Sequence, residues 1–106
     1  MPFMDYQGTE LEVDENGFII DPSLWDEDMA RFLAKEHEGI NELSDDHWTV
    51  IHYLNEYYHQ FGIAPLVRKI CKDTGFKLKY IYEMFPNGPA NGACKVAGLP
   101  KPTGCV

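Results

Sequence analysis

The chain has 106 residues, a hydrophobic fraction of 44% and a net charge of −8, which suits one compact domain and excludes two separate cores. No apolar run approaches the roughly 20 residues of a membrane-spanning helix, so no membrane insertion is expected. The first 14 residues lack the basic and apolar regions of a secretion signal, so we expect a cytoplasmic protein.

The charge is unevenly distributed along the chain. Residues 1–67 contain 15 acidic and two basic residues, whereas residues 68–106 contain two acidic and seven basic residues. The acidic first part disfavours general nucleic-acid binding because it would repel phosphate. The basic second part either steers an anionic partner or substrate, or is a solvated surface without that role.

The first predicted element is a β-hairpin or small antiparallel sheet over about residues 5–20. Leu11 and Val13 alternate with acidic residues, and an apolar run, residues 18–20, follows Asn16-Gly17. Asn-Gly favours a type I′ turn, in which both central residues need positive φ.

Helical spacing of apolar residues, with caps and breakers at the ends, predicts a helical bundle downstream. Pro22 begins the first helix and Ser44 caps the second, which carries the broadest apolar stripe. The fourth helix is expected to turn its apolar residues inward, namely Leu78, Ile81, Tyr82 and Phe85. The predicted helices cover residues 21–38, 44–61, 65–74, 77–85 and 89–97.

The tail differs in kind from the bundle. Residues 98–106 contain Pro100 and Pro102, which cannot continue a helix, and glycines near both ends. The sequence therefore predicts a globular domain over residues 1–97 and a mobile C-terminal arm over residues 98–106.

Two of the three cysteines are candidates for chemistry. Cys105 is the penultimate residue, where a thiol has reach and exposure. Cys94 precedes it by 11 positions, so the arm can fold back to form a disulfide or to hold an extra sulfur between the two thiols. Lys95 and Lys101 lie near these thiols in sequence and would favour the thiolate. Alternatively, Cys105 is an incidental surface residue and Cys94 a partly buried apolar one.

The remaining candidates are weaker. Cys71 lies on the apolar face of the third predicted helix and is interpreted as a core residue. The four histidines lack the spacing of a metal site, so no metal is expected. Helices 44–61 and 65–74 resemble a helix-turn-helix unit, but the second begins with apolar Pro65-Leu66-Val67 instead of base-reading side chains. The histidines are His37, His47, His52 and His59.

Residues 94–106, Cys-Lys-Val-Ala-Gly-Leu-Pro-Lys-Pro-Thr-Gly-Cys-Val, resemble the C-terminal arm of the DsrC/TusE family. Residues 13–18, 62–68 and 85–89 resemble the family's other landmarks, so the likeness spans most of the chain. TusE-like members keep only the penultimate thiol, whereas this chain has both. It also lacks a short insertion after Gly75 that TusE and relatives from sulfur oxidisers carry, which favours the sulfite-reducing DsrC type.

The resemblance implies a sulfur carrier and co-substrate of dissimilatory sulfite reductase. Cys105 would enter the α/β subunits of that enzyme and accept sulfur near their sirohaem, and Cys94 would close a trisulfide with it. A membrane-associated reductase complex would then regenerate both thiols. The sirohaem and iron–sulfur clusters belong to the partner, so no cofactor is expected on this chain, and no turnover by the chain alone.

Two alternative functions remain open at this point. One is a TusE-like sulfurtransferase relay for tRNA thiolation, which would not need Cys94. The other is a helix-turn-helix regulator that binds DNA. Whether the chain operates in sulfite reduction or in sulfur oxidation is not decided by the residues themselves.

Overall fold

The computed structural model describes residues 3–100, so Cys105 and the other residues of 101–106 lie outside the described part, as do residues 1–2. A two-stranded antiparallel sheet precedes a set of helices, which confirms the predicted α+β class. No helix within the described residues is long and apolar enough to cross a membrane.

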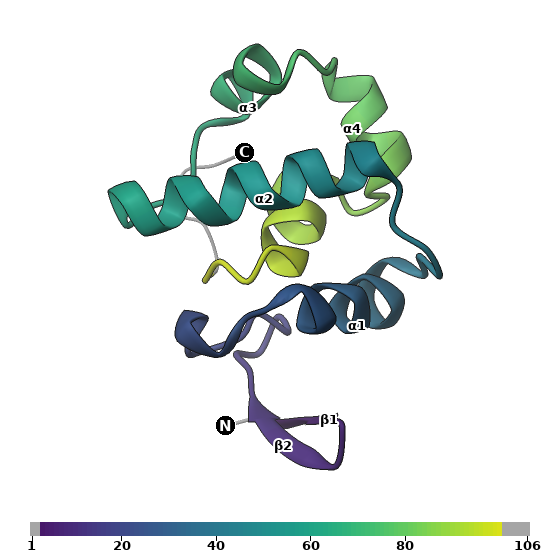
Figure 1. Ribbon diagram of the computed structural model, residues 1–106, viewed down its shortest axis with the longest axis vertical. Coiled ribbons are helices and arrows are strands. Elements are labelled where there is room, and N and C mark those ends of the chain that lie inside the picture. The colour runs from purple at the N-terminus through teal and green to yellow at the C-terminus, as the bar shows by residue number, and fades with distance from the viewer. Residues whose placement is uncertain (1–2, 101–106) are drawn as a thin grey trace.

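The elements are arranged along the long axis of the molecule (Figure 1). The hairpin of β1 and β2 lies at one end, and α3 and α4 lie at the other. A last helix, wound with the wide turns of a π-helix, lies between α1 and α2. The bounds are β1 Phe3–Tyr6, β2 Thr9–Glu12, α1 Glu27–Glu38, α2 Asp45–Phe61, α3 Val67–Thr74, α4 Leu78–Met84 and the last helix Pro89–Cys94.

The hairpin is present, but its main turn differs from the prediction. Strands β1 and β2 pair through the two-residue turn Gln7-Gly8, whose φ values are 51° and 82°. Positive φ at both positions is the requirement of a type I′ turn. A turn also forms at Asn16-Gly17, but only Gly17 has positive φ, so it is not the predicted type I′ turn, and it joins only a single bridge between Val13 and Ile19.

The Asn16-Gly17 turn is held by hydrogen bonds to one nearby side chain, that of Asp14. Asp14 accepts hydrogen bonds from the backbone N–H of Asn16 at 2.8 Å and of Phe18 at 3.0 Å. The chain then enters a 3₁₀ turn at Pro22–Leu24, so too few residues remain between Gly17 and Pro22 to form a full strand.

The helix predicted from residue 21 is two elements. Asp21 caps only the short 3₁₀ turn, and the chain is extended at Trp25. Asp26 then accepts a hydrogen bond from the backbone N–H of Met29 and begins α1, which ends at Gly39 as predicted. The apolar spacing alone fits one helix that begins at Asp21, so it does not reveal the additional cap at Asp26.

The other helices lie close to their predicted ranges. Ser44 caps α2 and Gly62 ends it in the left-handed conformation, which confirms that prediction. In α4, however, Leu78 and Tyr82 are 41% and 51% exposed, so their predicted inward orientation is wrong. Ile81 and Phe85, also predicted to point inward, are fully buried, which confirms that part of the prediction, and Met84 is buried with them.

The last helix completes the hydrophobic core. Its small side chains allow close approach by α1 and α2, and Ala93 and Ala97 are fully buried. Burial of apolar surface contributes about 25 cal/mol per Å², so this central position makes the last helix a main part of the core. Cys94, one of the two candidate thiols, therefore lies inside the domain.

Candidate functional site

Cys94 lies at the C-terminal end of the last helix and is fully buried. The sequence analysis predicted a helical position for it, which the structure confirms. Cys105, the other predicted site residue, lies outside the described residues, so its position relative to Cys94 stays a prediction. Cys71 is half-buried on α3 and packs against the core.

Directly after Cys94 the chain reverses through Gly98, which has φ +80°. The Leu99 N–H donates to the Cys94 carbonyl at 3.1 Å, and the Gly98 N–H donates to the Lys95 carbonyl at 3.2 Å. These two bonds form a Schellman motif, which ends a helix and redirects the chain. The motif fixes the backbone of Cys94 to the first residues of the tail.

Side chains from distant elements satisfy the next two carbonyls. The Trp25 indole N–H donates to the Val96 carbonyl at 2.9 Å, and the Asn55 amide donates to the Ala97 carbonyl at the same distance. An α-helical end leaves four carbonyls without helical partners. Here all four are paired, from Cys94 to Ala97, so the end of this helix is fully hydrogen-bonded inside the core.

The domain extends further than the predicted boundary at residue 97. Leu99 is fully buried, and a side chain at Gly98 would place its Cβ 2.3 Å from the Trp25 ring. The sequence analysis placed both residues in the arm because glycine and proline dominate that stretch. Leu99 instead belongs to the core, so any arm begins after it.

The opposite end of the last helix is held by a buried carboxylate. Glu38, 9% exposed, accepts hydrogen bonds from the backbone N–H of Asn87 at 3.0 Å and from its side-chain amide. A Cβ at Gly92 would lie 2.2 Å from a Glu38 oxygen, so only glycine fits there. The carboxylate therefore sets both the start of the helix and the close approach of its middle.

This buried carboxylate interacts electrostatically with Lys95, which is partly buried. Burial raises the pKa of Glu38, although hydrogen bonds from Asn87 and the charge of Lys95 act in the opposite direction. Burial likewise lowers the pKa of Lys95, against the attraction of Glu38 and Asp14. The Lys95 ammonium lies 5.1 Å from the centre of the Phe18 ring. The predicted stabilisation of a nearby thiolate by Lys95 therefore competes with the attraction of Lys95 to Glu38, Asp14 and Phe18.

Within the part of the chain that the structure describes, no three His, Cys, Asp or Glu side chains gather as metal ligands would. Two of the histidines have other partners. His47 accepts from the Ser44 backbone N–H at 3.1 Å and its other ring nitrogen lies 3.0 Å from the Met84 carbonyl. His52 lies 2.8 Å from a Glu27 carboxylate oxygen.

The sequence analysis missed the residues that hold Cys94 in place: Trp25, Asn55, Glu38 and Asn87. Glu38 carries one usable signal, because an acidic side chain in the last turn of a helix opposes the helix dipole and needs another reason to be there. Trp25 and Asn55 carry none, since their partners are backbone carbonyls more than 40 residues away in sequence.

Comparison with known proteins places these features in a family. The model of a family described as "DsrC like protein" matches residues 5–106. The chain is 52% identical to the "Sulfite reductase, dissimilatory-type subunit gamma" of Nitratidesulfovibrio vulgaris, over the full length of both chains. It is 38% identical to the "Sulfurtransferase TusE" of Escherichia coli K12, over 95% of this chain and 97% of that one.

A similar fold occurs in a solved structure. A chain in the "Crystal structure of dissimilatory sulfite reductase I (DsrI)" superposes with a TM-score of 0.88 and 50% identity, and the match covers 99% of this chain and all of that chain. The likeness therefore includes the last helix and the chain reversal after Cys94.

Proposed function

Since the chain belongs to the DsrC-like protein family, we propose that it is a sulfur carrier and co-substrate of dissimilatory sulfite reductase. The observation that carries this proposal is full-length alignment with a gamma subunit, combined with a second cysteine that the fold seats where the tail begins. The structural neighbour from a sulfite reductase crystal supports association with that enzyme.

In the proposed cycle, Cys105 is the acceptor and Cys94 the resolving thiol. The stretch from Leu99 to Cys105 can span about 20 Å when extended, enough to carry a thiol into a partner. The α/β subunits would supply electrons to reduce sulfite. Sulfite, two thiols, two electrons and four protons then yield a trisulfide between the cysteines and three waters.

Return to the starting state requires a reductant. Four electrons and four protons convert the trisulfide to hydrogen sulfide and restore both thiols. We assign this step to a membrane-associated reductase complex. On this account the chain turns over only together with its partners, and the sirohaem stays in the reductase.

The buried position of Cys94 supports its assigned role. A thiol within the core is shielded from small oxidants in solution, and closure then depends on sulfur that the chain's own tail delivers. The hydrogen-bonded helix end holds the backbone of Cys94 in one place, which favours ring closure at a defined position.

A TusE-like relay is the second candidate, supported by 38% identity to that sulfurtransferase. Substitution Cys94→Ala separates the two functions, because a relay needs only the terminal thiol. After incubation with sulfite reductase, sulfite and reductant, we expect the variant to carry a persulfide that alkylating reagents trap, and no bridged product. Normal sulfide release by Cys94→Ala would favour the relay, and Cys71→Ser provides the control that should behave as the native chain.

A further inference from the structure

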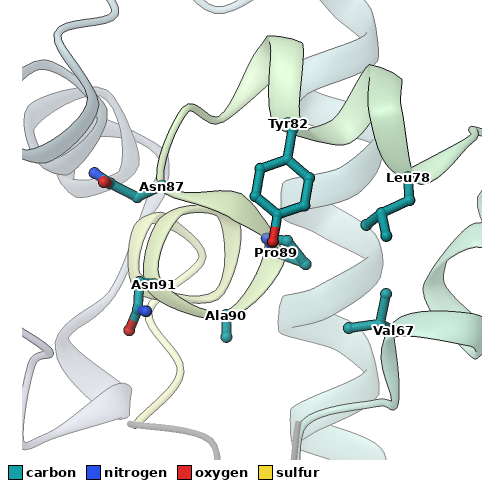
Figure 2. A pocket seen from close by; sticks show the side chains of 7 residues that line it. All are labelled: Val67, Leu78, Tyr82, Asn87, Pro89, Ala90 and Asn91. Carbon is teal, nitrogen blue, oxygen red and sulfur yellow. The ribbon is translucent and has the colours of Figure 1, made fainter. Parts of the chain in front are cut away.

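A small apolar pocket lies between α3, α4 and the start of the last helix. Its apolar and aromatic walls are Val67 from α3, Leu78 and Tyr82 from α4, and Pro89 and Ala90 from the last helix, and the polar residues Asn87 and Asn91 complete the lining. Figure 2 shows Val67 and Leu78 pointing toward one another while the Tyr82 ring extends toward Pro89. Leu78 and Tyr82 are four residues apart, so they share one face of their helix.

The pocket wall is shaped by a glycine. Gly88 has φ +86°, and a Cβ there would lie 2.7 Å from the Tyr82 ring. The ring therefore lies against the backbone at Gly88, and a Cβ at this position would force the ring to shift. The pocket exists before anything enters it, so an occupant would not need to order this wall.

The size of the pocket indicates the kind of occupant. Its volume is about 240 Å³, below the roughly 300–1,000 Å³ typical of sites for small molecules. Five of the seven lining side chains are apolar or aromatic, and the amide of Asn87 already donates to Glu38, so the pocket offers little to a polar metabolite. A single aliphatic or aromatic side chain, inserted from a protein surface, fits both the size and the chemistry.

The surroundings of the pocket are basic. Arg68 follows Val67 in the chain, and Lys77 and Lys79 flank Leu78, so three basic residues are sequence neighbours of the pocket's lining. Among the described residues no ion pair joins any of these three to a carboxylate. Carboxylates beside the inserted side chain would complement this charge.

Resting on the proposed function, we infer that this pocket is a docking site for a protein partner that inserts one apolar side chain bordered by carboxylates. The last helix connects the pocket to the site: Pro89 and Ala90 line the pocket at one end, and Cys94 lies at the other. At a helical rise of about 1.5 Å per residue, the five steps from Pro89 to Cys94 span roughly 8 Å along the helix axis. A partner docked here would be held close to the point where the tail leaves the domain.

The test measures binding of the full-length reduced chain to immobilised α/β sulfite reductase freed of its gamma subunit. Leu78→Asp places a charge in the pocket and should weaken binding about tenfold or more. Leu24→Asp is the matched control, because Leu24 is 54% exposed and belongs to the 3₁₀ turn before α1. Equal binding by the native chain and Leu78→Asp would overturn the docking site.

Charge is tested separately with Lys79→Glu, and Lys35→Glu on α1 is its control. We expect Lys79→Glu to weaken binding several-fold at low salt and to flatten its salt dependence, with little effect at Lys35. Two other results would overturn the inference. One is tight binding of duplex DNA that Lys79→Glu weakens and Leu78→Asp does not. The other is self-association of the native chain in sedimentation that Leu78→Asp abolishes.

Failure of docking and failure of the proposed function give different results. Sulfur loading is measured by mass on the same samples. If the native chain binds and is loaded, and Leu78→Asp binds equally well, only the docking site is wrong. If the native chain neither binds nor is loaded, the sulfur-carrier function itself is wrong, and the docking inference falls with it.

Discussion

The two ends of the last helix have opposite character. At its C-terminal end every carbonyl from Cys94 to Ala97 has a hydrogen-bond donor, and the side chains are buried. At its N-terminal end Pro89 and Ala90 face a pocket whose α4 wall is half-exposed. The last helix thus has the buried thiol of Cys94 at one end and the partly exposed pocket at the other.

The two ends also differ in the free energy that it costs to disturb them. A hydrogen-bonded, buried end costs free energy to open, because unpaired carbonyls in a core are unfavourable by about 1–3 kcal/mol each. An exposed apolar pocket loses little stability when a side chain in it changes. Mutations at the two ends should therefore separate stability from partner binding.

The largest expected effect comes from the same substitution at two leucines. Leu99→Ala removes a fully buried side chain and should lower the free energy of unfolding by about 3 kcal/mol. Leu66→Ala, at a residue 64% exposed near the pocket, should change it by less than about 0.5 kcal/mol. Urea denaturation of both variants measures the difference, and equal effects would show that Leu99 does not belong to the core.

Next come the glycines that border the helix. Gly98→Ala strains a left-handed backbone and pushes Cβ into the Trp25 ring, so we expect a loss of about 2–3 kcal/mol. Gly88→Ala meets Tyr82, which is half-exposed and can move, so its loss should stay near 1–2 kcal/mol. Gly75→Ala, with φ +79° and open space around it, calibrates the backbone cost alone in the same denaturation experiment.

Comparison of Trp25 with Trp48 measures the contribution of the hydrogen bond to the Val96 carbonyl. Trp25→Phe removes the indole N–H that donates to the Val96 carbonyl and should cost about 1–2 kcal/mol more than Trp48→Phe. Trp48 is half-buried and packs against the same core, but no indole hydrogen bond is recorded for it among the described residues. Matching losses in thermal unfolding of the two variants would mean that the hydrogen bond contributes nothing.

The smallest effect concerns pH. Because the folded-state pKa of Glu38 is raised above its ordinary 4.5, the folded chain holds this proton more tightly than the unfolded chain does. Its contribution to stability is then present at low pH and lost as pH rises through the raised pKa. Glu38→Gln should therefore gain stability relative to the native chain across that window, and exposed Glu36→Gln should not. Parallel pH profiles of unfolding would contradict this.

Local signals explain what the sequence predicted well. Helix α2 begins at the Ser44 cap and ends at Gly62, and α1 ends at Gly39, because these residues act on their immediate neighbours in the chain. The hairpin was placed on the stronger dipeptide, Asn16-Gly17, yet Gln7-Gly8 makes the longer pairing because strand residues flank it on both sides. A turn signal alone does not reveal how much strand its flanks supply.

What the sequence did not predict depends on contacts between distant segments. Helix α4 has too few turns for periodicity to fix its buried face, so Leu78 and Tyr82 were assigned inward. Leu99 appeared to be part of a tail because its neighbours are glycine and proline, and its burial follows from the reversal at Gly98. The recognition of Cys94 came from its spacing to Cys105, whereas its hydrogen-bonded surroundings required the fold.

The central claim is that sulfur taken up by the chain ends between Cys94 and Cys105, and mass spectrometry of the chain after turnover with sulfite reductase and sulfite tests it most directly. We predict a gain of one sulfur atom with loss of two hydrogens, located by peptide mapping to a bridge between these two residues and absent from Cys71. Sulfur found on Cys105 alone in the native chain, or on Cys71, would contradict the account.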